Sequence, residues 1–120
     1  MQFNPVLPKD YRLPLRKELN RLKKEGRIFQ GQLFSLLTTP QEKDKTSRFA
    51  FIISNKIHKR ANKRNRARRL LVEAIYSFLP KIKKGYDGVF LAKKGILGVN
   101  LTKVKREMNS LLKKAHLLND

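Results

Sequence analysis

The stretch Lys56-Ile57-His58-Lys59-Arg60-Ala61-Asn62-Lys63-Arg64-Asn65-Arg66-Ala67-Arg68-Arg69 holds eight lysines and arginines in fourteen residues and no acidic side chain. An apolar pattern with helical spacing follows it directly, at Leu70, Leu71, Ala74, Ile75 and Phe78. The positive charge is therefore built into the start of a core helix and does not belong to a separate tail. This combination predicts a phosphate-binding surface.

Helical geometry separates the two faces of this segment. At about 100° per residue, Ala67 joins the apolar side, whereas Asn62, Asn65, Arg66, Arg69 and Glu73 lie on the other. Lys63 and Arg64 project onto the apolar side one turn too early. We therefore expect this end of the helix to extend past the core or to lie beside a second polar surface.

Cations in the first turns of a helix oppose its dipole, at a cost of about 0.3–1 kcal/mol each. A helix start that lacks the usual acidic residues and carries cations instead indicates a function there. The free N–H groups of the first turn, beside Arg and Lys, attract a polyanion. Two blander interpretations are a solvated charged face without a partner and a generic nuclear-type or heparin-type basic patch.

The composition is that of one strongly basic domain. The chain has 120 residues and a formal charge of +20, from 29 Lys and Arg against 9 Asp and Glu. Such charge favours an anionic partner, either nucleic acid or an anionic membrane surface. No apolar run approaches the roughly 20 residues that span a bilayer, the first ten residues do not form a secretory signal, and cysteine is absent. These features fit a cytoplasmic protein.

The remaining chain shows alternating helical and strand patterns. We expect an extended arm over residues 1–12, in which Phe3, Val6, Leu7 and Tyr11 can pack on the body. A short basic helix then runs from Pro14 to a stop at Gly26. Strand pattern covers 27–39, with a bulge or kink at Gly31, and a polar hairpin loop follows over 38–47.

The second half of the chain continues this alternation. Residues 48–54 form a nearly all-apolar strand, expected to be central. After the basic helix, strand pattern returns over 86–92, and a last helix covers 101–117 with an apolar stripe at Leu101, Val104, Met108, Leu111, Leu112 and Ala115. The order α-β-β-β-α-β-α predicts an α+β fold, a two-layer α/β sandwich. If the strands flanking the basic helix are parallel, their crossover is right-handed by default.

The motif Lys63-Arg64-Asn65-Arg66-Ala67-Arg68-Arg69-Leu70-Leu71 resembles the signature of the bacterial ribonuclease P protein subunit. Upstream Ser54-Asn55-Lys56, the strand 49–53 and Tyr86-Asp87-Gly88-Val89 match the family too, and length, charge and element order agree over nearly the whole chain. An Arg-Asn-Arg triplet alone would be weak, whereas the motif between two strands in a +20 chain is specific.

The resemblance implies a single RNA-binding domain over residues 1–120, similar to a ribosomal small-subunit protein domain, with a left-handed crossover that carries the Arg-Asn-Arg helix. It implies the accessory subunit of ribonuclease P, whose catalytic RNA and RNA-bound Mg²⁺ remove the 5′ leader of precursor tRNA. The implied partners are this RNA and precursor tRNA, without a membrane or protein partner. The RNA-subunit face would comprise Lys56, Lys59, Arg60, Lys63, Arg64, Asn65, Arg66, Arg68 and Arg69.

The family also binds the 5′ leader between its first helix and the sheet, often with aromatic side chains. This sequence departs from that pattern, because Leu19, Lys23 and Leu37 stand at the corresponding positions. Phe34 is the aromatic candidate for this leader site, with Phe29 nearby, and the alternative for both is core packing. Without stacking, worth about 1–3 kcal/mol per base, leader binding would depend on charge and on Lys23.

The residues favour no catalytic site in the protein itself. The nine acids are scattered, whereas metal-assisted hydrolysis needs clustered carboxylates. His58 and His116 are the only histidines, and we interpret them as an RNA contact and a helix-end residue, not as an acid–base pair. Ser54 and Thr38 lack a base partner in sequence. The protein alone is therefore expected to be inactive.

Three other functions compete with that of a ribozyme subunit. A ribosomal-type protein without a processing role would share the fold and the charge, but the Arg-Asn-Arg signature argues against it. An architectural DNA-binding protein would prefer duplex DNA to folded RNA. A membrane-surface role is weaker, because the apolar face of the basic helix has the composition of a protein core.

Overall fold

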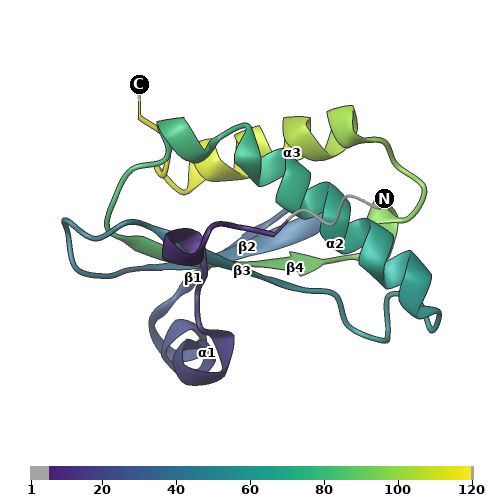
Figure 1. The fold of residues 1–120 in the computed structure, drawn as a ribbon, viewed down its shortest axis with the longest axis horizontal. Coiled ribbons are helices and arrows are strands. Elements are labelled where there is room, and N and C mark those ends of the chain that lie inside the picture. Colours follow the sequence, from purple (N-terminus) through teal and green to yellow (C-terminus); the bar gives the residue numbers. More distant parts are fainter. Residues whose placement is uncertain (1–5, 120) are drawn as a thin grey trace.

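The computed structural model describes residues 6–119 and confirms an α+β fold with the predicted element order (Figure 1). The helices and strands are α1 (Leu15–Glu25), β1 (Arg27–Gln30), β2 (Phe34–Pro40), β3 (Arg48–Ile52), α2 (Ala61–Tyr76), β4 (Tyr86–Ala92) and α3 (Leu101–Lys114). Short 3-10 helices occupy Lys9–Tyr11, Leu79–Lys81 and Lys94–Ile96. The predicted bounds of β4 agree with the structure, and Gly26 ends α1 as expected.

The four strands form one sheet in the order β1-β2-β4-β3. β2 pairs antiparallel with β1 and β4, and β3 pairs parallel with β4. Two expectations are therefore wrong. Residues 38–47 do not close a hairpin, because β4 lies between β2 and β3, and β3 is an edge strand, not a central one.

The apolar composition of β3 reflects covered faces and not lateral neighbours. Phe49 and Phe51 pack with Phe90 in the main core, at ring-centroid distances of 5.8 and 5.6 Å. Ala50 and Ile52 belong to a second apolar cluster on the other face. An edge strand can therefore have the continuous apolar sequence that is typical of a central strand when both of its faces are covered.

Helices cover both faces of the sheet (Figure 1). α2 and α3 lie side by side over one face, where the main core contains Phe34, Leu36, Phe90 and Leu71. α1 packs on the opposite face, where Leu22 meets Leu13, Leu37 and Val89 in the second cluster. The sheet therefore presents a different surface to α1 than to the signature helix α2.

The segment at Gly31 is a hairpin turn between β1 and β2, and not the bulge or kink that the sequence suggested. Glu107 of α3 accepts hydrogen bonds from the backbone N–H groups of Gln32, Leu33 and Phe34, at 2.8, 2.7 and 3.1 Å. A Cβ at Gly31 would lie 2.8 Å from the Glu107 carboxyl carbon. Glycine therefore allows the close approach of α3 to this turn.

The N-terminal segment covers part of the open edge of β3. Leu13 N–H donates to Phe49 O at 3.0 Å, and Arg12 forms an isolated parallel bridge with Phe49. Leu7 is buried in the main core and Tyr11 packs against it, whereas Val6 is exposed. Phe3, which the sequence placed in the same arm, lies outside the described residues. Over residues 6–119, no helix is long and apolar enough to cross a membrane.

Candidate RNA interface

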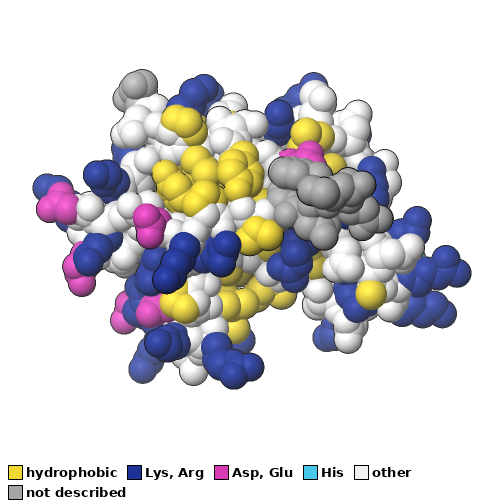
Figure 2. All heavy atoms as spheres, in the orientation of Figure 1, with side chains coloured by type: hydrophobic (Ala, Val, Ile, Leu, Met, Phe, Trp, Pro, Cys, Tyr) yellow, Lys and Arg dark blue, Asp and Glu magenta, His cyan; other side chains and the backbone are white. Residues whose placement is uncertain are grey.

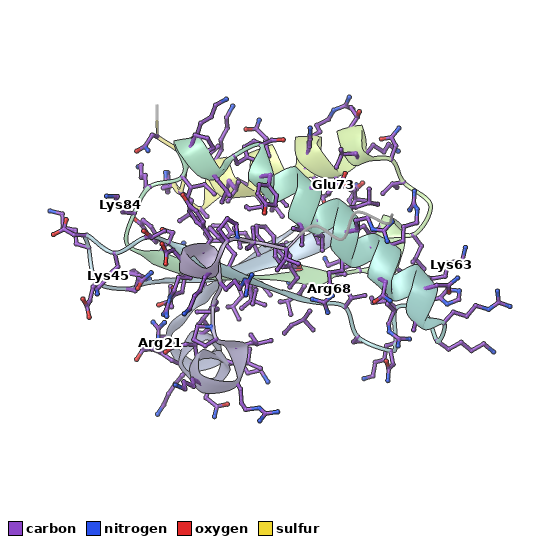
Figure 3. All side chains as sticks on the ribbon, in the orientation of Figure 1. Arg21, Lys45, Lys63, Arg68, Glu73 and Lys84 are labelled. Carbon is purple, nitrogen blue, oxygen red and sulfur yellow. The ribbon has the colours of Figure 1, made fainter. Side chains whose placement is uncertain are left out.

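The nine residues predicted for the RNA-subunit face come together at the start of α2 and in the loop before it. We call this set the basic surface: Lys56, Lys59, Arg60, Lys63, Arg64, Asn65, Arg66, Arg68 and Arg69. Seven of the nine are exposed, while Arg64 and Arg69 are partly buried. Figure 3 shows Lys63 at the end of α2 that extends beyond the sheet, and Figure 2 shows Lys and Arg side chains gathered at this end of the molecule. The expected extension of this helix end past the core is confirmed.

Arg64 holds the loop that precedes α2. Its Nη1 donates to the carbonyl oxygens of His58 and Lys59, at 2.8 and 2.9 Å. The loop is further fixed by the Arg60 N–H, which donates to His58 Nδ1 at 3.0 Å. Arg64 therefore shapes the basic surface as well as charging it, a role that the sequence did not indicate.

Arg66 and Arg68 extend to opposite flanks of α2. Arg66 Nη2 donates to Val99 O, just before α3, over a long 3.4 Å, and Arg68 Nη1 donates to Phe51 O of β3 at 3.2 Å. Side chains two positions apart on a helix point in directions that differ by about 200°. Arg66 and Arg68 therefore extend to opposite sides. The positive charge consequently wraps the helix and covers both the α3 side and the β3 side.

The start of α2 lacks the groups that usually neutralise a helix N-terminus. Its N-cap residue, Arg60, makes no side-chain capping bond, and the first turn contains no acidic residue. Within residues 6–119, no ion pair joins Lys56, Lys59 or Lys63 to a carboxylate. Helix-end N–H groups and uncompensated cations together make this end suited to bind phosphate.

A buried carboxylate fixes α1 on the other face of the sheet. Asp87 of β4 is fully buried and pairs with Arg21 of α1 and with Arg48 of β3. Arg48 binds it through two hydrogen bonds, at 2.9 and 2.8 Å. The bond to Glu18 is the main cause that raises the pKa of Arg21, and the bond to Asp87 raises the pKa of Arg48. Both guanidinium groups therefore stay charged, and that of Arg21 links α1 to the sheet through Asp87.

The predicted leader site is only partly assembled. Leu19 is half-buried and Lys23 exposed on α1, and Leu37 packs beneath that helix with Leu22. Phe34, in contrast, is fully buried on the opposite face, where its ring packs edge-on against Phe90 at 5.7 Å. Including Phe34 in the leader site is therefore wrong, because side chains alternate between the faces of a strand and its neighbour Ser35 takes the α1 side.

Phe29 also packs against the main core and so lies on the face away from α1. On the α1 face, four partly buried aliphatic side chains supply apolar surface instead. We call this set the apolar strip: Leu15, Ala50, Ile52 and Leu91. Figure 2 shows hydrophobic side chains gathered between α1 and the sheet. Sequence reasoning missed the strip because it looked for aromatic residues, whereas the alternation of β3 and β4 would have placed Ala50, Ile52 and Leu91 on one face.

Over residues 6–119, the histidines and the acidic side chains do not gather into one site. His58 lines a hollow beside α2, whereas His116 lines a different one near the end of α3. In the part of the chain that is described, no three His, Cys, Asp or Glu side chains gather as metal ligands would. Asp87, Glu18 and Glu107 are already engaged with arginines or backbone N–H groups.

Comparisons with known proteins agree with this architecture. The family model described as Ribonuclease P matches residues 7–116. The ribonuclease P protein component of Synechococcus elongatus is 34% identical over 118 residues, covering 95% of this chain and 97% of that protein. The ribonuclease P protein from Thermotoga maritima superimposes with a TM-score of 0.77 at 28% identity, over 86% of this chain and 96% of that one. The Staphylococcus aureus protein shares the fold, with a TM-score of 0.81 at 21% identity over 92% and 100% of the two chains.

Proposed function

Because the chain belongs to the ribonuclease P protein component family, we propose that its basic surface binds the catalytic RNA subunit of that ribonucleoprotein. The complex would remove the 5′ leader from precursor tRNA. The observation that carries this proposal is the concentration of exposed cations on the loop and first turns of α2, held in shape by the Arg64 bonds to His58 and Lys59. Phosphate contacts of this kind supply most of the affinity for RNA and make it depend on salt.

The protein's part in this reaction is to bind and orient RNA. The described residues provide no cluster of metal ligands, so the catalytic Mg²⁺ would be held by the RNA subunit. That ion would supply activation of water and stabilisation of the leaving oxygen. The protein would neutralise phosphate charge where the RNA and the substrate meet, and it would be inactive alone.

The leader of precursor tRNA would lie against the α1 face of the sheet. The apolar strip offers surface on which unstacked bases can rest, and Lys23 adds positive charge on α1. Ile52→Asp should therefore weaken binding of precursor tRNA to the assembled complex while leaving binding of mature tRNA unchanged. Phe34→Leu, a change on the opposite face, should leave the preference for precursor intact. Equal effects of Ile52→Asp on both tRNAs would contradict this placement of the leader.

The basic surface can be tested by removing single charges. Lys63→Ala and Arg66→Ala should each weaken binding to the RNA subunit and reduce the slope of log affinity against log salt by about one. Lys45→Ala is the matched control, because Lys45 lies at the opposite end of the molecule from Lys63 (Figure 3). The proposal fails if removal of Lys45 changes affinity and slope as much as removal of Lys63.

A further inference from the structure

A hollow of about 380 Å³ lies beside the basic surface, between the start of α2 and the segment that leads into α3. It is formed by His58 of the loop before α2, by α2 itself and by residues 96–98, which end and follow the 3-10 helix Lys94–Ile96. This volume is near the lower end of the range for pockets that hold small ligands, about 300–1,000 Å³. The hollow therefore suits a single small group and cannot admit a double helix.

The hollow combines an apolar floor with a cationic rim. Ala67, Ile96 and Leu97 supply the floor, and the first two are almost completely buried. Lys63 and Arg66 line it from α2. The side chains that line the hollow include no acid, so the rim favours an anion next to an apolar surface.

His58 adds an oriented ring to this lining. Its Nδ1 accepts the Arg60 N–H at 3.0 Å, so the ring hydrogen of the neutral imidazole lies on Nε2. The ring is thereby fixed by the loop, with Nε2–H as its remaining donor. A flat, oriented imidazole can stack on or donate to a nucleobase.

The wall opposite α2 is a tight turn. Leu97 N–H donates to Lys94 O at 3.1 Å, and Arg66 reaches across to Val99 O. Gly98 has a φ of +81°, and apart from Gly98 and its two chain neighbours no atom lies within 4 Å of the position that a Cβ would take there. The turn therefore forms the wall without closing over the hollow.

We propose that this hollow receives one unpaired nucleotide of the RNA partner, with its base against Ala67, Ile96 and Leu97 and its phosphate toward Lys63 and Arg66. The inference rests on the proposed function, since it names the RNA feature that the same surface would read. A base within a duplex is stacked and paired and cannot enter, so the nucleotide comes from a bulge, loop or single strand. A site for phosphate alone would not need the apolar floor.

The floor can be tested without changing charge. Leu97→Ala should weaken binding of the full protein to the ribonuclease P RNA subunit about fivefold, with the salt slope unchanged. Leu118→Ala is the matched control, because Leu118 is also half-buried and lies near the C-terminus, away from this hollow. If the parent shows steep salt dependence but the Leu97→Ala variant binds with the same affinity as the parent, the nucleotide pocket is contradicted. The proposed function would then still stand. A flat salt titration of the parent would overturn the proposed function itself.

A second measurement is independent of any variant. In NMR titrations of the full protein, uridine or adenosine 5′-monophosphate should shift the Ile96 methyl and Gly98 amide signals, whereas ribose 5-phosphate should shift them little. Equal shifts from the nucleotide and from ribose 5-phosphate would overturn the base-binding assignment and leave only a phosphate site.

Discussion

Arg64 uses its guanidinium to shape the loop before α2, and this distinguishes it from the lysines around it. One nitrogen donates to two successive carbonyls, of His58 and Lys59, so the side chain closes the loop onto the helix. A lysine carries the same charge on a single flexible ammonium and does not reproduce the planar guanidinium. The identity of the residue should therefore matter as well as its charge.

We expect Arg64→Lys to weaken binding to the RNA subunit about three- to tenfold, although the net charge is unchanged. The loss would come from a loop that no longer presents Lys59 and Arg60 in place. Lys63→Arg, a charge-conserving change at the exposed neighbour, should bind as the parent does. A filter-binding or fluorescence titration at one salt concentration compares the three proteins, and parent-like affinity of Arg64→Lys would mean that only its charge counts.

At the same scale, the ion pairs of Arg21 and Arg48 determine how their stabilising effect depends on pH. Their carboxylate partners raise both pKa values, so their stabilising effect is complete below the ordinary arginine pKa and is lost only when pH rises through the higher folded-state value. Around neutral pH, both guanidinium groups therefore remain charged. Titration of these two arginines therefore does not alter the attachment of α1 to the sheet in that range.

At the scale of the elements, α3 fixes the β1–β2 hairpin through one carboxylate. Glu107→Ala would remove the acceptor for the N–H groups of Gln32, Leu33 and Phe34, and we expect the free energy of unfolding to fall by about 2 kcal/mol. Glu107→Gln keeps one acceptor oxygen and should lose less. Ser110→Ala, at an exposed position of the same helix, should change stability by less than about 0.5 kcal/mol. Denaturant titration measures all three variants.

The local sequence pattern predicted where the helices and strands lie, but it did not predict which strands pair with each other. The short apolar run of β4 and the helical stripe of α3 indicated both elements, because these patterns are local properties of successive residues. The order β1-β2-β4-β3 depends on pairings between distant segments, which local pattern does not contain. The same limit explains Phe34: its apolar character predicted burial, but only the register with β1 and β4 decides which face it takes.

The candidate site also has features that the sequence predicted and features that only the structure shows. Lys56 to Arg69 could be recognised from charge density and helical spacing, since both are local properties of the chain. The reach of Arg66 to Val99 and the hollow against Ile96 depend on where α3 and its preceding turn lie. The bond from Arg66 to Val99 spans 33 positions, so a short sequence window could not reveal it. The Arg64 clamp is local, but it depends on the conformation of the loop, which charge density does not specify.

For the whole molecule, a charge of +20 and two distinct surfaces fit the proposed function, in which the protein contacts two RNAs. The basic surface lies at the start of α2, and the apolar strip lies on the α1 face of the sheet. A protein arranged in this way would hold the catalytic RNA with one surface and the leader with the other, and its own residues would add no hydrolytic step.

The most direct test of this account is cleavage of precursor tRNA by the ribonuclease P RNA subunit at low Mg²⁺, measured with and without the protein. We expect the protein to restore 5′ maturation at Mg²⁺ concentrations where the RNA alone is slow, and to cleave nothing in the absence of the RNA. Binding of that RNA without faster cleavage would contradict the account and would favour a structural, ribosomal-type role. Cleavage by the protein alone would contradict it more deeply, because an active site would then lie among its own residues.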